Sequence, residues 1–330
     1  MDRVELLRSR GEAQAAFHQQ ARQRRDTVFG NTVFVRGVVE VSNVCRENCR
    51  YCAMRRDNRE LDRYRLSAEM ILELLLEHRP ASITDIDIQA GEDPVAVREI
   101  VVPLVHELRQ QTDLGITLCL GTLAAEDFAL LREAGADYYI LKIETGDAAH
   151  YRQIEAPGTL AQRVAAVENL AATGWKVSSG LIAGLPGQTE EQLLETFRLL
   201  ERLPLAGCSV SPFIAGPQTP FADDSNGGLE LTLNCVALLR HLNPQWIIPA
   251  VSAMRLVGAE GYVRALNAGA NLTTINLTPP AYRSSYPIYT RDRFIMDEER
   301  VLEAIDRAGC RPSTIGVADH LRNLALPATA

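Results

Sequence analysis

Residues 33–41 read VFVRGVVEV, and residues 42–52, which follow directly, read SNVCRENCRYC. The first stretch consists mostly of β-branched apolar residues, which is typical of a buried strand. The second stretch carries three cysteines just beyond the end of that strand. Farther along the chain, apolar runs of strand length alternate with segments of helical periodicity. This repeated order predicts an α/β fold in which helices cover a parallel sheet.

The alternation defines eight strand–helix units. The expected strands cover residues 33–41, 83–89, 116–121, 138–144, 176–183, 208–213, 246–251 and 272–277. The expected helices cover residues 67–78, 95–111, 125–134, 160–173, 188–202, 230–242, 259–268 and 297–309. Eight units predict a single (β/α)8 barrel of the TIM type, and an open doubly wound sheet is the alternative.

The domain organisation follows from the same pattern. We expect residues 1–30 to form a helical lead-in and residues 31–320 to form the barrel. Residues 321–330 are expected to be a loose tail. No low-complexity segment or shift in composition marks a second domain.

Composition limits the partners and the compartment. The 330-residue chain has 34 Lys and Arg against 42 Asp and Glu, a net charge of −8. We therefore expect no general affinity for nucleic acid or for an anionic membrane, which needs concentrated positive charge. No apolar stretch reaches the roughly 18 residues of a membrane helix, and the charged N-terminus lacks the apolar core of a secretory signal. Seven cysteines, three of them within eight residues, favour a metal or catalytic role in a reducing cytoplasm over disulfides.

The clustered cysteines have the spacing C-x3-C-x2-C, at Cys45, Cys49 and Cys52. Three thiolates on a tight loop can bind three irons of a [4Fe–4S] cluster. The fourth iron then lacks a protein ligand and can take a small chelating molecule, as an open zinc position takes a substrate. A structural zinc site would need a fourth ligand, and His78 is the nearest candidate in sequence. Three cysteines packed as small apolar residues are the remaining alternative, which the spacing and the flanking residues disfavour.

Other polar residues also follow predicted strands. Gly91 and Glu92 follow the second strand, Glu144 ends the fourth, and the turn at residues 184–187 follows the fifth. In a βα barrel, the loops at the carboxyl ends of the strands carry the chemistry. A carboxylate among apolar neighbours at position 144 must face a polar cavity or a partner. The turn lacks the Lys-Ser/Thr ending of a phosphate loop, so we expect no nucleoside triphosphate.

The cysteine spacing, with an aromatic residue before the last cysteine, resembles the radical S-adenosylmethionine superfamily. Residues 45–58 (CRENCRYCAMRRDN), 89–94 (QAGEDP), 184–189 (GLPGQT) and 278–283 (TPPAYR) resemble a clade within it. That clade holds biotin synthase, methylornithine synthase and the [FeFe]-hydrogenase maturase HydE, and the similarity to HydE is the greatest. The resemblance implies one [4Fe–4S] cluster that cleaves S-adenosyl-L-methionine reductively to methionine and a 5′-deoxyadenosyl radical. It also implies a low-potential electron donor, a ferredoxin or a flavodoxin.

The resemblance further assigns contacts to S-adenosylmethionine. Residues 90–92 match the family's Gly-Gly-Glu motif, which receives the cofactor's amino group, and Arg163 matches an arginine that pairs with its carboxylate. Without the family, residues 91–94 would be read as a loop and helix start, and Arg163 as a solvated helix residue. The implied contacts are Tyr51, Ala90, Gly91, Glu92, Glu144, Arg163 and Leu185.

Several residues at or beyond the last two strands are candidates for the substrate end of the cavity. They are Arg255, Asn271, Thr278, Tyr282, Arg283, Tyr286 and Tyr289. Taken singly, each tyrosine also fits core or rim packing. Lys142 and Ile143 stand where HydE has an Arg-His pair, so the chain departs from HydE there.

Four functions are compatible with these features. The leading one is HydE-like action on a small sulfur-containing or iron-bound molecule, with an iron–sulfur cofactor assembly protein as a partner. The second is a methylornithine-synthase-like rearrangement of an amino acid's carbon skeleton. Sulfur insertion of the biotin synthase type is disfavoured, because Thr117 and Ser178 stand where that enzyme has cysteines for a second cluster, although Arg255 resembles its cluster-ligating arginine. A non-enzymatic iron–sulfur scaffold would leave the S-adenosylmethionine contacts without a task.

Overall fold

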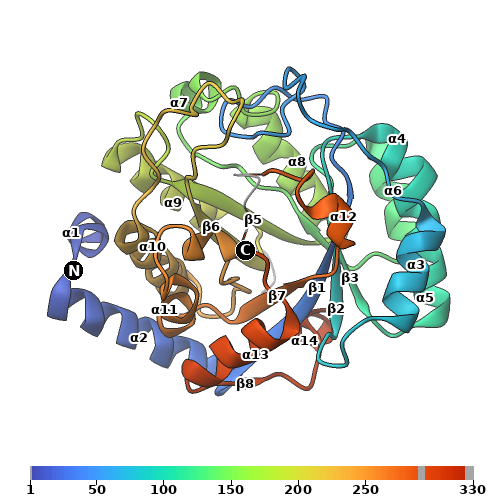
Figure 1. Ribbon diagram of the computed structural model, residues 1–330. Helices are drawn as coiled ribbons and strands as arrows, with labels where there is room; N and C mark the ends of the chain where they lie inside the picture. The colour runs from blue at the N-terminus through green and yellow to red at the C-terminus, as the bar shows by residue number, and fades with distance from the viewer. Residues whose placement is uncertain (1, 289–293, 324–330) are drawn as a thin grey trace.

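Parallel strands lie side by side at the centre of the computed structural model, which describes residues 2–288 and 294–323. The strands follow the order β6-β5-β4-β3-β2-β1-β7, so strands that are consecutive in sequence are mostly neighbours in space. They are β1 (Thr32–Ser42), β2 (Asp85–Ala90), β3 (Gly115–Cys119), β4 (Tyr138–Ile140), β5 (Lys176–Ala183), β6 (Gly207–Pro212) and β7 (Leu272–Asn276). Helices surround this sheet (Figure 1).

The segment at residues 246–250 closes the sheet between β6 and β7. Ile247 bridges β6 in parallel, and Pro249 bridges β7. Backbone hydrogen bonds of 2.8 to 3.1 Å reinforce both bridges. The expected strand at 246–251 is therefore a pair of isolated bridges, because Pro249 has no N–H to donate to a ladder. The predicted (β/α)8 barrel is confirmed, with this segment in the place of its seventh strand.

The eight predicted helices are present, and short further helices lie between them. The predicted ones are α3 (Ala68–Glu77), α4 (Pro94–Ala96) continuing through a π turn (Val97–Val101) into α5 (Val102–Gln111), α6 (Ala125–Ala134), α8 (Leu160–Ala172), α9 (Glu190–Arg202), α10 (Leu229–Leu242), α11 (Gly261–Asn267) and α13 (Glu298–Arg307). The further ones are α7 (Ala148–Gln153), a 3-10 turn (Ser252–Arg255) and α12 (Pro280–Arg283). Two long helices begin at a Thr-x-x-Gln capping box, Thr159 with Gln162 and Thr189 with Gln192.

Two N-terminal helices cover the amino end of the barrel. These are α1 (Arg3–Arg8) and α2 (Gly11–Phe29), and α2 packs against α10. Phe17 and Ala21 on α2 are fully buried. The buried Arg25 guanidinium donates to the carbonyl oxygens of Leu266 at 2.7 Å and Ala270 at 3.2 Å. The predicted helical lead-in is therefore the floor of the barrel.

The C-terminal segment is more ordered than the sequence suggested. A short strand, β8 (Arg311–Pro312), pairs with the start of β1, and α14 (Val317–Asn323) follows it. The first two N–H groups of α14 donate to the buried Asp85 carboxylate at 2.8 and 3.0 Å. Leu321 is buried in this helix, so the expected loose tail does not begin there. Residues 324–330 lie outside the described residues.

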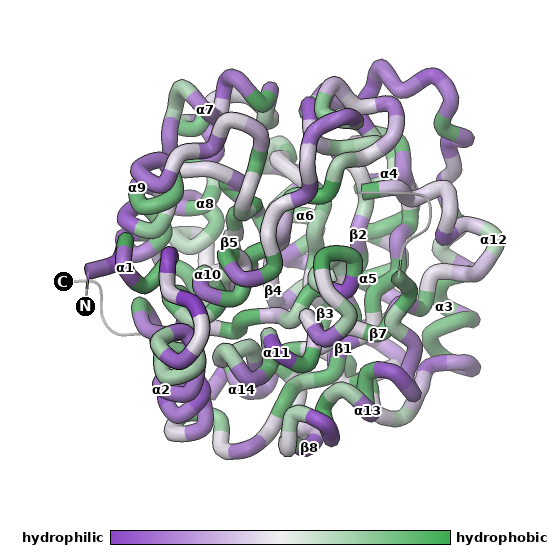
Figure 2. The backbone as a smooth tube through the Cα atoms, turned by 60° about the vertical axis from the view of Figure 1, so that its left-hand side comes forward, coloured by the Kyte–Doolittle hydropathy of each residue, from purple (hydrophilic) through white to green (hydrophobic). Residues whose placement is uncertain are grey.

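The outer helices are amphipathic. Along them the tube in Figure 2 changes between hydrophilic and hydrophobic colours within single turns, as expected when one face packs on the sheet. In α9, for example, Leu193, Phe197 and Leu200 are buried at helical spacing. Within the part of the chain that the structure describes, no helix is long and apolar enough to cross a membrane.

Candidate active site

A cavity of about 300 Å³ opens at the carboxyl ends of the strands. It is lined by the three clustered cysteines and by most of the residues that the sequence singled out. The predicted residues that line it are Cys45, Cys49, Cys52, Tyr51, Ala90, Gly91, Glu92, Glu144, Arg163 and Tyr286. The structure thus brings together residues from the loop after β1, from β2, from the segment after β4 and from α8.

The loop that carries the cysteines is fixed by one arginine that the sequence did not single out. The Arg63 guanidinium donates to the carbonyl oxygens of Asn43 at 2.6 Å, Met54 at 2.9 Å and Arg55 at 2.7 Å. These bonds join the start and the end of the loop. Burial raises the pKa of the Cys52 thiol to about 12, so the thiol is protonated in the free protein and must lose its proton when it binds a metal.

Gly91 and Glu92 lie directly against the cysteine loop. The Glu92 N–H points to the Cys45 Sγ at 3.4 Å. A Cβ atom on Gly91 would meet the Val44 carbonyl oxygen at 2.3 Å, so this close approach requires glycine. The contact places a backbone donor beside one of the three thiols.

The Glu92 carboxylate is the centre of a buried polar network. It accepts hydrogen bonds from Arg163 at 3.2 Å, Arg46 at 3.3 Å and the Thr122 N–H at 3.0 Å. Arg163 stands in the first turn of α8, which the capping box at Thr159 fixes. The Arg163 Nε has no hydrogen-bond partner although the side chain is 93% buried. An unpartnered buried donor next to a carboxylate is suited to a ligand that has both an acceptor and a donor.

Glu144 adds a second carboxylate to the same cavity. Its backbone is left-handed, with φ of 60°, and its Oε2 is buried without a hydrogen-bond partner. Burial raises the pKa of this carboxyl group, while Lys142 and Arg163 act in the opposite direction. Strained backbone and unsatisfied polar atoms concentrate at functional sites.

Tyr51 and Leu185 lie side by side at one edge. Leu185 is buried in an apolar cluster with Tyr151 and Ile182, and Tyr51 packs against that cluster. Leu185 does not line the cavity, since Tyr51 reaches it instead. The pair forms an apolar wall beside the cysteine loop.

The inner part of the cavity contains charged residues that the sequence analysis missed. Arg36 forms a buried ion pair with Asp87 at 3.1 Å and donates to the Thr274 hydroxyl at 3.2 Å. Glu40 also lines the cavity and accepts from Asn276 at 3.3 Å. The available signal was a charged residue inside an otherwise apolar strand, as with Arg36 and Glu40 in β1, because such a side chain must point to a polar interior.

Of the predicted substrate residues, Tyr286 lines the cavity and the others support it or lie elsewhere. Thr278 donates to the Glu40 carboxylate at 3.1 Å, and Arg283 donates to the Thr278 carbonyl oxygen at 2.6 Å, so both stand behind Glu40. Asn271 is buried at the amino end of β7, where it accepts from Arg240 at 3.0 Å.

The remaining candidates pack against aromatic rings away from the cavity. Tyr282 packs on Tyr64 with ring centroids 5.0 Å apart. The Arg255 guanidinium lies 4.5 Å from the ring centroid of Phe294. Tyr289 lies outside the described residues.

The residues of the cavity fit an iron–sulfur cluster with a chelating ligand. Among the described residues, no three His, Cys, Asp or Glu side chains converge to hold a single metal ion. A [4Fe–4S] cluster does not need that convergence, because each thiolate binds a different iron. The unpartnered atoms of Glu144 and Arg163 and the glycine cradle at Gly91 give the ligand its polar contacts.

Comparison with known proteins agrees with this geometry. A model of the radical SAM superfamily matches residues 39–200. The [FeFe] hydrogenase maturase subunit HydE of Thermotoga maritima is 33% identical over 93% of this chain and 89% of that protein. A 3-methylornithine synthase of Methanosarcina barkeri is 30% identical over 89% of this chain and 84% of that protein.

A solved structure shares the fold over the whole barrel. The crystal structure of methylornithine synthase (PylB) superimposes with a TM-score of 0.83 at 28% identity, covering 94% of this chain and 93% of that one. Identity of a third over nine tenths of both chains, with three cysteines, a glutamate and an arginine gathered at one cavity, supports a single conclusion. The chain is an enzyme that belongs to the radical SAM superfamily.

Proposed function

We propose that this enzyme binds one [4Fe–4S] cluster through Cys45, Cys49 and Cys52 and S-adenosylmethionine beside it. The observation that carries the proposal is that the thiols, the Glu92–Arg163 pair and the unpartnered Glu144 oxygen all face one cavity. When bound, the cluster and the cofactor supply reductive cleavage of the sulfonium group and an organic radical that abstracts hydrogen.

The chain's own residues bind and orient the cofactor. Glu92 and Glu144 accept from the ammonium group and the ribose hydroxyls, and Arg163 pairs with the carboxylate. Tyr51 and Leu185 provide the apolar wall for the adenine. The closed barrel keeps water from the reacting atoms, which a radical reaction requires.

The substrate is a small polar molecule held in the inner part of the cavity. Arg36, Glu40 and Lys142 place charges of both signs around it, and 300 Å³ is at the lower end of ligand pockets. Following the HydE relative, we infer a small sulfur-containing or iron-bound molecule, with an iron–sulfur cofactor assembly protein as a partner. The PylB likeness supports rearrangement of an amino acid as the second candidate.

Mass spectrometry of 5′-deoxyadenosine tests the proposal. The protein is reconstituted anaerobically with iron and sulfide and then given dithionite and S-adenosylmethionine. The wild-type protein should form 5′-deoxyadenosine, and Cys49→Ala should form none, because a cluster ligand is lost. The buried Cys235→Ala is the matched control, since Cys235 lies in α10 away from the cavity. Wild-type turnover by Cys49→Ala would remove the cluster from this loop.

A second measurement distinguishes the two substrate classes. Deuterated cysteine-derived thiols and deuterated amino acids are added separately, and deuterium in 5′-deoxyadenosine identifies the hydrogen donor. Transfer from a thiol supports the HydE-like reading, and transfer from a free amino acid supports the second candidate. A verified cluster that binds S-adenosylmethionine but forms no 5′-deoxyadenosine with any of them would contradict both.

A further inference from the structure

The loop that carries the cysteines is strongly basic in an acidic protein. Residues 45–65 contain seven arginines and four acidic residues, whereas the whole chain has a net charge of −8. The arginines are Arg46, Arg50, Arg55, Arg56, Arg59, Arg63 and Arg65. A concentration of positive charge on one segment needs an explanation beyond solubility.

Several of these arginines have tasks within the protein. Arg63 holds the loop carbonyls, Arg46 pairs with Glu92, and Arg65 forms a bidentate pair with Asp93. Such contacts explain part of the arginine content. They do not explain the arginines at the tip of the loop.

Arg56 and Arg59 are exposed at that tip. The Arg56 side chain is 61% exposed, and its ion pair with Asp57, 52% exposed, spans 3.3 Å. A pair this open to water contributes little to stability. The neighbouring Glu60 accepts a hydrogen bond from Gln218 at 2.9 Å, so the carboxylates of the tip are engaged with the protein while both guanidinium groups face outward.

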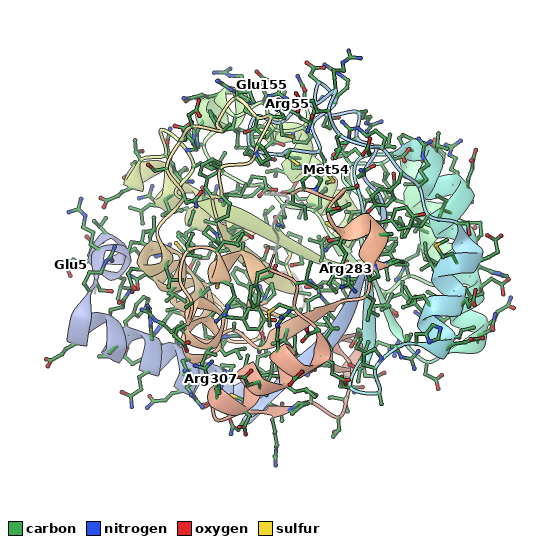
Figure 3. All side chains as sticks on the ribbon, viewed as in Figure 1. Glu5, Met54, Arg55, Glu155, Arg283 and Arg307 are labelled. Atoms are coloured by element: carbon green, nitrogen blue, oxygen red, sulfur yellow. The ribbon has the colours of Figure 1, made fainter. Side chains whose placement is uncertain are left out.

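The same loop separates the cavity from solvent. Cys45 and Cys52 are half-buried and line the cavity from the inside, and the arginines lie on the outer side a few residues along the chain. Figure 3 places Met54 and Arg55 at the upper edge of the molecule, at the opposite end from Arg307. A partner that binds the outer arginines would therefore sit over the thiols.

We propose that the outer face of residues 45–65 is the docking surface for an acidic one-electron carrier protein of the flavodoxin type. This inference rests on the proposed function, which requires one electron for each cleavage. One electron leaves the reduced flavin of the carrier and enters the cluster, so the carrier is oxidised and the cluster is reduced by one electron each. Complementary charge suits such transient encounters, which are small and depend on electrostatic steering.

Binding and turnover of a charge-reversed enzyme test the surface. The variant Arg56→Glu/Arg59→Glu reverses two exposed charges without touching the cavity. The matched control is Arg24→Glu/Arg311→Glu, whose positions are exposed on α2 and β8 at the far end of the barrel. Each reconstituted protein is measured for its Kd toward a bacterial flavodoxin at low and high salt. It is also measured for 5′-deoxyadenosine formation driven by reduced flavodoxin or by dithionite.

We expect the loop variant to bind flavodoxin about tenfold more weakly at low salt and to lose that difference at high salt, because screening removes steering. Flavodoxin-driven turnover should fall in parallel, while dithionite-driven turnover, which needs no docking, should be unchanged. If the double reversal loses its cluster, Arg56→Gln/Arg59→Gln should show the same pattern with a smaller loss.

The outcomes separate this proposal from the proposed function. Wild-type flavodoxin affinity in a cluster-loaded loop variant, or an equal loss in the Arg24→Glu/Arg311→Glu control, overturns the docking surface and leaves the function intact. Absence of 5′-deoxyadenosine from the wild-type protein with dithionite overturns the function itself.

Discussion

Glu144 combines a left-handed backbone with a buried carboxylate oxygen that has no partner. A non-glycine residue in this conformation costs roughly 1–3 kcal/mol, and such strain persists where the surrounding structure enforces it. Here the parallel bridge to Leu181 fixes the backbone on both sides. The strain thus directs the carboxylate to the cavity, where the proposed cofactor contact offsets it.

Glu144→Gln removes the charge and keeps the size of the side chain. We expect the Kd for S-adenosylmethionine to rise about tenfold or more, since a hydrogen bond to a charged group contributes roughly 1.5–3 kcal/mol. The iron content should stay at the wild-type level because no thiol is changed. Glu155→Gln is the control, as Glu155 also has a left-handed backbone, with φ of 50°, but is exposed. Equal affinity in all three proteins, measured by anaerobic calorimetry, would remove Glu144 from the site.

Gly91→Ala tests the close approach between the loops after β1 and β2. The added Cβ would lie 2.3 Å from the Val44 carbonyl oxygen, so one of the two loops must move. We expect less iron per chain after reconstitution and a loss of roughly 1–3 kcal/mol in stability, as for other overpacked sites. Gly228→Ala is the control, because nothing lies within 4 Å of its Cβ position. Full iron content in Gly91→Ala would show that the cradle is dispensable.

At the scale of elements, the sequence was most informative where periodicity is long. The strands from β1 to β7 and the eight main helices were all expected, because each has either an apolar run or an amphipathic pattern. The two residues of β8 and the single turns of α7 and α12 were not expected, since such short elements carry no period. Their positions follow from tertiary pairing, as between Thr32 and Arg311.

The candidate site was predictable where a residue type implies a chemistry. The cysteines, Glu92 and Arg163 follow strand ends or match a motif, and the structure brings them together. Arg36 and Asp87 were missed, because their side-chain direction depends on strand register, which the sequence does not reveal. Arg255 was placed near the cavity for a similar reason, since the 3-10 turn that turns it toward Phe294 has no clear signal in the sequence.

The helix α2 was expected to be a lead-in, and the structure makes it part of the core. Phe17 is 1% exposed, and its ring lies 5.1 Å from that of His241 on α10. Phe17→Ala should lower the free energy of unfolding by about 3–5 kcal/mol, the usual cost of a large cavity. Gln20→Ala, at an exposed position of the same helix, should change it by less than about 0.5 kcal/mol. Denaturant titration gives both values, and equal midpoints would return α2 to a peripheral role.

At the scale of the whole molecule, the site joins parts of the chain that are far apart in sequence. The buried pair Glu92–Arg163 links the end of β2 to α8, and Arg46 extends it to the cysteine loop. A ligand that contacts all of these parts stabilises the folded chain as one unit by RT ln(1 + [L]/Kd), about 2.7 kcal/mol at a hundredfold excess over Kd.

Glu92→Gln separates this coupling from simple stability. Removing one partner of a buried ion pair costs roughly 3–5 kcal/mol, so the variant should melt below the wild-type protein even without ligand. The informative quantity is the ligand-dependent change in Tm. S-adenosylmethionine should raise the Tm of the reconstituted wild-type protein by on the order of 5 °C. It should leave that of Glu92→Gln nearly unchanged, whereas the exposed Glu126→Gln should respond as the wild type does. A full ligand-dependent rise in Glu92→Gln would mean that the carboxylate serves the fold alone, and the proposed ammonium contact would then rest on Glu144.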